Sequence, residues 1–308
     1  MDKSEILAVV KSQVKNEASR NLRLPNLIDF YLQEKCLHVT IKEQGVIKNM
    51  QENASAFESW IFALKCYVDF DLVVLNWHSN REDNNNVHYK RFLLRMYFFE
   101  KTYNWVSICD SKNEEMKRIG LLVENNKFWI NYPKGESKKE AENKEANLER
   151  HIIDSWKKLN TNEIFNHQLP VGLFIDKISE NYQFTPGKGS QIDIWKITED
   201  TLRIYELKHD DNTDIGIISE LMYYANVIHL LLNDNIQYPS PKNLKKNLRG
   251  ESDFYGKIQD KTIKKLEAVF FANKFHPLIT EKKDDILRLL NENSFGIKYF
   301  QQDLPCTD

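Results

Sequence analysis

The sequence predicts a protein of the α+β and α/β classes, in which an N-terminal α+β domain precedes a domain with a mixed central β-sheet flanked by helices. One observation is the order of elements in the second half, where two strands joined by a short turn precede a helix, a strand, a helix and a last strand. The other is a polar, charge-dense stretch at residues 131–150, which separates the two halves. The predicted domains are residues 1–137 and 138–308.

Composition limits the class of protein. The chain has 308 residues, of which 41% are hydrophobic and 29% charged, so it is long and apolar enough for a packed core. A net charge of −2 excludes a globally basic protein but allows a local basic patch. The four cysteines are scattered without a Cys-x-x-Cys pair, which favours reduced thiols over a zinc site. The N-terminal stretch has only a short apolar run, so we expect a soluble, cytoplasmic protein without a membrane partner.

The first domain mixes helix and strand signals. Ser55 followed by Glu58 matches a capping box before apolar helical spacing, which predicts a helix over residues 55–68. The aromatic-rich apolar runs at residues 70–78 and 91–101 predict buried strands, and residues 127–132 predict a shorter one. This part carries no chemical motif, and its role in recognition, dimerisation or partner binding stays open.

In the second domain, segments with the apolar spacing of helices alternate with segments typical of strands. Apolar spacing predicts helices and strands with a polar, lysine-bearing excursion between them. The predicted helices are 145–159, 214–232 and 284–293, the predicted strands are 168–175, 191–197, 202–208, 266–275 and 296–302, and the excursion runs over 233–265.

The first two long strands of this domain form a predicted hairpin. A two-residue turn at residues 199–200 sets a register that pairs Trp195 with Ile204 and Asp193 with Glu206. Because side chains alternate along a strand, all four point to one face of the sheet. Two carboxylates that face each other across strands lie roughly 4.5–5.5 Å apart at Cβ and repel each other unless something compensates.

A divalent cation is the expected compensator for this acidic pair. Mg²⁺ is typically held by one or two carboxylates together with water and phosphate oxygens. Lys208, two residues after Glu206 on the same face, adds a positive charge at the same place. A solvated edge with Lys208 paired to Glu206 is the alternative, but the apolar neighbours Trp195 and Ile204 favour a buried face with charges at one end.

These residues resemble the motif of the PD-(D/E)xK nuclease superfamily, whose members have a restriction-endonuclease-like fold. The match is "IDIWKI" followed by "YELK", with a glycine-rich approach "GKGSQID", and it covers the C-terminal half only. The proline of the family motif is replaced by Ile192. The resemblance implies that Asp193, Glu206 and Lys208 are catalytic. It also implies a Mg²⁺ or Mn²⁺ ion held by Asp193, Glu206 and the Leu207 carbonyl.

The resemblance also indicates residues outside the hairpin. Glu149 borders the apolar stripe of the helix before the sheet, where family members often carry a metal-linked glutamate; a solvated boundary glutamate is the alternative. Glu220 and Tyr224 occupy the positions of a Gln-x-x-x-Tyr pair found in several branches. We expect Glu220 to orient Lys208 rather than contact DNA, and Tyr224 to pack in the core, with substrate contact as the alternative. Gln191 is a further supporting candidate.

The expected activity is that of a magnesium-dependent deoxyribonuclease, a metal-binding phosphodiester hydrolase. Lys245, Lys246 and Arg249 in the excursion are candidates for sequence-independent phosphate contacts, with a solvated loop as the alternative. A catalytically inactive nuclease-fold binding or assembly module is the second hypothesis, and a glycosidase with two carboxylates is a remote third. DNA is the expected partner and a homodimer a further expectation. The choice between DNA and RNA, the sequence specificity and the mode of cleavage stay open.

Overall fold

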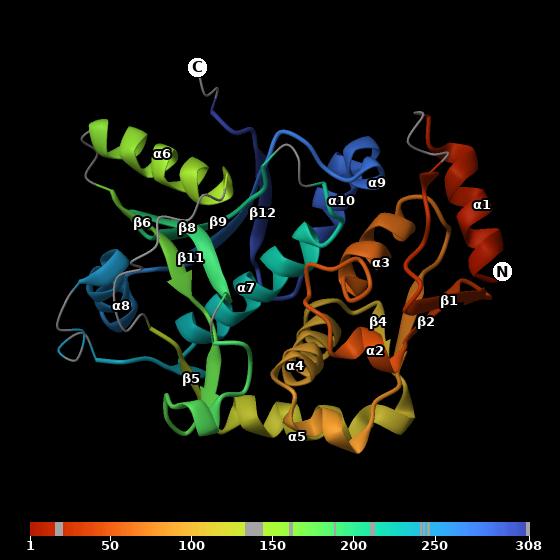
Figure 1. The fold of residues 1–308 in the computed structure, drawn as a ribbon, viewed down its shortest axis with the longest axis horizontal. Coiled ribbons are helices and arrows are strands. Elements are labelled where there is room, and N and C mark those ends of the chain that lie inside the picture. Colours follow the sequence, from red (N-terminus) through yellow and green to blue (C-terminus); the bar gives the residue numbers. More distant parts are fainter. Residues whose placement is uncertain are drawn as a thin grey trace. The chain divides into compact units, whose positions relative to one another are not determined.

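The computed structural model describes residues 1–15, 21–132, 144–159, 163–187, 189–209, 213–240, 242, 244 and 247–305. The protein is a mixed α+β structure, as predicted (Figure 1). Its chain forms two compact units, each made of separate segments. The first unit comprises Met1–Leu121, Thr213–Glu220 and Phe275–Gly296, and the second comprises Leu122–Asn212, Leu221–Lys274 and Ile297–Asp308.

These units differ from the two consecutive domains that the sequence predicts. Two segments of the C-terminal half, Thr213–Glu220 and Phe275–Gly296, belong to the first unit. Conversely, β5 (Phe128–Ile130), which the sequence assigns to the first domain, pairs within the second unit. The charge-dense stretch marks a change of composition, whereas the boundaries of the two units are set by the packing of segments that are distant in the sequence.

The first unit has a four-stranded sheet in the order β1-β2-β3-β4, with helices between the strands. The β1–β2 pair is antiparallel, and the β2–β3 and β3–β4 pairs are parallel. Strand β3 confirms the strand predicted over residues 70–78. The elements are α1 (Lys3–Gln13), β1 (Ile28–Gln33), β2 (Cys36–Ile41), α2 (Glu43–Val46), α3 (Phe57–Lys65), β3 (Leu72–Trp77), α4 (Val87–Thr102), β4 (Val106–Ile108), α5 (Asn113–Glu124), α9 (Pro277–Glu281) and α10 (Lys283–Leu290).

The strand predicted over residues 91–101 is wrong, because this segment lies inside helix α4. The Asn86 side chain caps the helix by accepting hydrogen bonds from the backbone N–H groups of His88 (2.8 Å) and Tyr89 (3.4 Å). Aromatic residues favour strands only weakly, and tertiary packing overrides that preference here. In the helix, Arg91 and Arg95 lie one turn apart, and both are buried.

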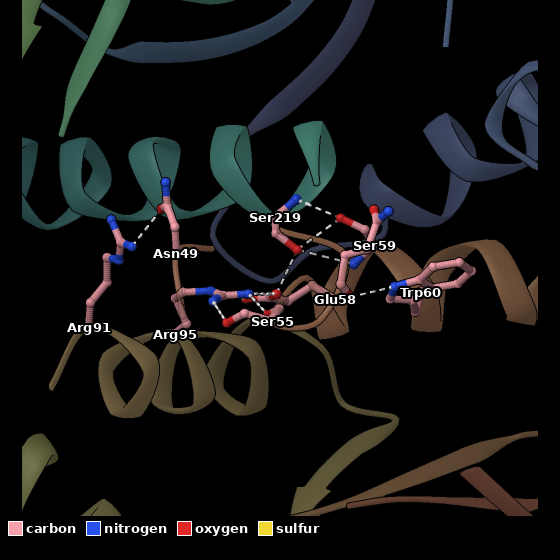
Figure 2. Close-up of polar contacts among 9 residues, drawn as sticks. Asn49, Ser55, Glu58, Ser59, Trp60, Arg91, Arg95 and Ser219 are labelled. Atoms are coloured by element: carbon pink, nitrogen blue, oxygen red, sulfur yellow. Dashed lines mark hydrogen bonds and ion pairs between the residues drawn. The ribbon is translucent and has the colours of Figure 1, made fainter. Parts of the chain in front are cut away.

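Buried polar groups connect α3, α4 and the Thr213–Glu220 segment within the first unit (Figure 2). Arg95 donates to both carboxylate oxygens of Glu58 and to the Ser55 carbonyl oxygen (2.8 Å). The Ser219 hydroxyl donates to Glu58 at 2.7 Å and lies 2.8 Å from the Ser59 hydroxyl. The predicted helix is therefore confirmed as α3, but its predicted capping box is wrong. The N-cap is Ala56, and Glu58 binds Arg95 instead.

The second unit contains a five-stranded mixed sheet in the order β12-β11-β9-β8-β6. The β6–β8 and β8–β9 pairs are antiparallel, and the β9–β11 and β11–β12 pairs are parallel. A smaller sheet has the order β10-β5-β7. The remaining elements are α6 (Lys144–Lys158), β6 (Ile164–Pro170), β7 (Leu173–Ile175), β8 (Gln191–Thr198), β9 (Thr201–Leu207), α7 (Ile217–Leu232), β10 (Ile236–Gln237), α8 (Glu251–Gln259), β11 (Lys265–Phe271) and β12 (Lys298–Gln302).

Most predicted elements of this half are confirmed, but strand β10 and helix α9 were not predicted, and two further differences concern residues 168–175 and the excursion. The strand predicted over residues 168–175 is two strands, β6 and β7, separated at Gly172. A Cβ at Gly172 would lie 2.7 Å from the Gly187 Cα, so the chain turns there by a close backbone approach that only glycine permits. The excursion at residues 233–265 contains the unpredicted helix α8.

Helix α6 covers one face of the five-stranded sheet, and Figure 1 shows α7 on its other side. The apolar stripe of α6, Leu148, Ile152 and Ile153, packs on side chains from β8, β9 and β11. Each such buried side chain contributes roughly 1.5–3 kcal/mol. The sheet residues in this cluster are Ile194, Tyr205, Leu207, Val269 and Phe271. Since Ile194, Tyr205 and Leu207 face α6, their sequence neighbours face the other side.

Candidate functional site

The β8–β9 hairpin has the register that the sequence predicts. Thr198 pairs with Thr201, Trp195 with Ile204, and Ile194 with Tyr205. The two-residue turn is closed by Glu199 in the left-handed region, with φ of 53°. The paired residues end at Ile194 and Tyr205, so the predicted pairing of Asp193 with Glu206 lies one residue beyond the observed register, at the end of the hairpin away from the turn.

Asp193 interacts with the β9 backbone where the main-chain pairing of the hairpin ends. Its Oδ2 atom accepts a hydrogen bond of 2.7 Å from the Leu207 N–H. The last backbone pair recorded at this end is Ile194 with Tyr205, while β9 continues to pair with β11 as far as Leu207. The carboxylate of Asp193 therefore lies directly beside the backbone that links Glu206 to Lys208, the other two predicted catalytic residues.

Glu206 and Lys208 form a buried ion pair on one face of β9. The Lys208 ammonium donates to Glu206 Oε1, and the two residues are only 6% and 1% exposed, respectively. The pair lies at the end of an apolar row formed by Leu202 and Ile204 on the same strand. The ammonium group is thus held beside the Glu206 carboxylate in a place that water reaches poorly, where electrostatic interactions are stronger than in bulk water.

Glu149 lies on the other face of the sheet. Its side chain is buried, and its Oε2 atom is 3.4 Å from the His167 Nδ1 atom on β6. His167 pairs with Ile194, which faces α6. Alternation places Asp193 and Glu206 on the opposite face. Glu206 and Lys208 are in contact and Asp193 binds the backbone between them, whereas Glu149 lies beside His167 on the other face of the sheet.

The two residues predicted on α7 have different surroundings. Glu220 is buried, belongs to the first unit and accepts a hydrogen bond from the Gln51 side chain. Tyr224 is buried in the second unit, with its ring 5.9 Å from that of Tyr223. The expected core position of Tyr224 is confirmed, and the expected action of Glu220 on Lys208 stays a prediction.

Gln191 and Arg249 contact each other beside the site. Arg249 Nη1 donates to Gln191 Oε1 (3.3 Å) and to the Gln168 carbonyl oxygen (3.1 Å). Lys245 and Lys246, the other two predicted phosphate contacts, lie outside the described residues.

Sequence reasoning missed Glu251, the first residue of α8. Glu251 is 1% exposed, and its Oε1 atom has no hydrogen-bond partner among the described residues. Burial raises the pKa of this carboxyl to about 8, although the Arg249 charge opposes the rise. The signal was available: Glu251 is spaced with Phe254, Tyr255 and Ile258 at helical intervals, which predicts that it faces the core.

His209, the residue after Lys208, lies on the α6 side of the sheet. It lines a hollow of about 420 Å³ together with residues of α6 and of the chain after β11 and β12. The other lining residues are Lys144, Asn147, Leu148, His151, Asn273, Leu304 and Pro305. The hollow is therefore separate from the face that carries Glu206.

Asp193 and Glu206 offer carboxylate oxygens, which suit Mg²⁺ better than Zn²⁺. Within the described ranges, no group of three or more His, Cys, Asp or Glu side chains is arranged to hold a metal ion. Mg²⁺ needs fewer protein ligands, since it keeps several of its waters and binds through one or two carboxylates. Asp193 and Glu206 supply that number of hard oxygen ligands, so the residues fit this ion.

Comparisons with protein-family models, with curated proteins and with solved structures found no match to this chain. None of the helices in the described ranges is long and apolar enough to cross a membrane.

Proposed function

We propose that the second unit is a metal-dependent nuclease that hydrolyses phosphodiester bonds in nucleic acid, with DNA as the expected substrate. The observation that carries this proposal is that Asp193 binds the Leu207 N–H, between the ion-paired residues Glu206 and Lys208, where the β8–β9 pairing ends. The order of α6, three antiparallel strands, α7 and the parallel strand β11 supports the likeness to the restriction-endonuclease-like fold.

Asp193 and Glu206 would hold Mg²⁺ or Mn²⁺, with the Leu207 carbonyl as a further ligand. When bound, such an ion polarises a phosphate and lowers the pKa of a coordinated water. The Leu207 N–H fixes the Asp193 carboxylate in one orientation, which reduces the reorganisation needed to bind a ligand.

Lys208 acts on the reacting phosphate and on water. Its ammonium is already restrained by Glu206 and largely excluded from solvent. A positive charge held in place before the reaction stabilises negative charge that develops in the transition state. Lys208 would also position the attacking water, because its three N–H donors can reach both the carboxylate and a neighbouring oxygen.

Cleavage assays with variants of matched shape test the proposal. Supercoiled, linear and single-stranded DNA and RNA of one sequence are incubated with Mg²⁺, Mn²⁺ or EDTA. Asp193→Asn keeps an oxygen that can accept the Leu207 N–H bond but removes the charge. We expect this variant to lose cleavage by about 10²-fold or more. Asp200→Asn, an equal change of charge at the turn of the same hairpin, should cleave normally. Metal-dependent cleavage that survives in both Asp193→Asn and Glu206→Gln would refute the proposal.

One observation favours the second candidate, an inactive nuclease-fold binding module. The Lys208 ammonium already occupies Glu206 Oε1, and an incoming cation would compete with it for that oxygen. Titration calorimetry with Mn²⁺ separates the two candidates. A nuclease should bind the ion, and Asp193→Asn should lose this binding. An inactive module should give no Asp193-dependent heat.

A further inference from the structure

Arg249 contacts strand β6 at the position that faces Asp193 of β8 in the register of the two strands. In the β6–β8 register, His167 pairs with Ile194 and Leu169 with Ile192, so Gln168 is the residue opposite Asp193. The Gln168 carbonyl accepts a hydrogen bond from Arg249. Because neighbouring strands are about 4.8 Å apart, the guanidinium lies within roughly 10 Å of the Asp193 backbone.

The second acceptor of Arg249 places it over the catalytic face of the sheet. This acceptor is the Gln191 side chain, two residues before Asp193 on β8. Residues i and i+2 of a strand share a face, so the Gln191 and Asp193 side chains point to the same side. Both neighbours of the guanidinium therefore flank the acidic pair.

The guanidinium has N–H donors that no described residue accepts a hydrogen bond from. Both of its hydrogen bonds are made by Nη1 to neutral oxygens, and no carboxylate of the described residues lies within ion-pair distance of it. A guanidinium has five N–H donors in a planar fork. The Nε and Nη2 edge thus remains available to a planar pair of oxygens, as carried by a phosphate.

The backbone around Arg249 is fixed against the sheet. Arg249 and Gly250 both have left-handed conformations, with φ of 54° and 70°. A Cβ at Gly250 would lie 3.0 Å from the Trp195 ring and 3.3 Å from the Asn166 amide nitrogen, so the backbone approaches β8 and β6 closely. Arg249 is itself half-buried, and α8 begins two residues later. A fixed segment therefore holds the guanidinium over this face.

We propose that Arg249 binds a backbone phosphate of the nucleic acid, next to the phosphodiester held at Asp193 and Glu206. The position relative to the reacting bond rests on the proposed function, whereas the phosphate contact itself does not. A contact of this kind carries no sequence information and fixes the register of the strand. The phosphate contact predicted for the excursion is thereby assigned to a residue that flanks the catalytic centre.

Binding measurements with the metal chelated test the contact separately from cleavage. Fluorescence anisotropy with a labelled duplex, a DNA single strand and an RNA of the same sequence is recorded over a range of salt. Arg249→Asn is the informative variant, because asparagine tolerates a left-handed backbone better than most residues. Lys264→Asn makes the same change of charge at an exposed position before β11. Urea unfolding of both variants checks that the fold is retained.

We expect Arg249→Asn to weaken binding of the preferred substrate by about tenfold or more, as for loss of a charged hydrogen bond. The slope of log K against log salt should fall by about one, and Lys264→Asn should change neither quantity. Unchanged affinity and slope in a folded Arg249→Asn protein would overturn the inference, as would the absence of nucleic-acid binding by the unsubstituted protein.

The two proposals fail in different ways. Binding that depends on Arg249, together with no cleavage in the presence of any metal ion, would support the phosphate contact and refute the nuclease proposal. Cleavage that depends on Asp193, with normal binding and cleavage by Arg249→Asn, would support the nuclease and overturn the contact.

Discussion

Replacing Lys208 with methionine removes one charge of a buried ion pair and leaves the other. Glu206 is 1% exposed, so its carboxylate cannot turn to solvent once the ammonium is gone. Breaking a buried pair in this way costs about 3–5 kcal/mol. A protein of ordinary stability unfolds with about 5–15 kcal/mol, so the loss would be a large share of the total.

A double-mutant cycle isolates the contribution of the pair. Glu206→Gln alone should also destabilise, because it leaves a buried ammonium. The double variant Glu206→Gln/Lys208→Met buries no charge, and we expect its free energy of unfolding to lie within about 1 kcal/mol of the unsubstituted protein. The coupling energy should therefore be several kcal/mol and opposite in sign to the two single losses.

Urea unfolding followed by tryptophan fluorescence, with the metal chelated, measures all four proteins. Lys196→Met is the matched control: Lys196 lies in the same hairpin and pairs with Glu163, but its side chain is 18% exposed. We expect a loss of about 1 kcal/mol or less there. If Lys208→Met costs no more than this control, or the double variant is as unstable as the sum of the single variants, the electrostatic account of this pair is wrong.

Three further predictions concern the two units. Arg95→Met should lower the free energy of unfolding by about 3–5 kcal/mol, since it leaves the buried Glu58 carboxylate without its cation, and thermal denaturation would detect the loss. A stability equal to that of the unsubstituted protein would contradict it. The pKa of Glu251 is raised from 4.5 to about 8, so the folded protein keeps a proton that the unfolded chain releases. The free energy of unfolding should therefore fall between about pH 4.5 and 8, and Glu251→Gln should abolish about 3–5 kcal/mol of this fall in urea titrations at a series of pH values. Parallel pH profiles for the two proteins would show that Glu251 does not titrate in this way. Gly216→Ala should destabilise by about 1–3 kcal/mol in the same assay, because the added Cβ would overlap the carbonyl oxygen of Gln51; a neutral effect would mean that this contact relaxes freely.

Local signals in the sequence predicted the hairpin and its register well. The polar two-residue turn leaves little freedom, because a slip of one residue would move every side chain of one strand to the opposite face of the sheet. The same alternation predicted that Glu206 and Lys208 share a face. These parts of the site depend on neighbours within about twenty residues.

The parts that depend on distant contacts were not predictable from local patterns. The sequence of α4 predicts a strand because its aromatic residues are common in sheets. The capping residue Asn86 was the local signal that indicates a helix. Glu58 reads as a capping residue because its partner, Arg95, is far along the chain. The sequence does not distinguish Arg249 from the other cationic residues of the polar excursion. Its position near β6 and β8 follows from how these strands fold.

The interleaved segments of the two units constrain when each unit can fold during synthesis and how the units can be separated. The first unit takes residues Phe275–Gly296 into its own structure, so it cannot be complete until residue 296 has been synthesised. At roughly 5–20 residues per second, its N-terminal part would wait on the order of ten seconds or more for these last helices. A fragment starting at residue 138 would carry α9 and α10 without the rest of their unit, and their buried side chains, such as Leu278 and Leu290, would be exposed. Proteolysis at a single point could therefore not release the second unit intact.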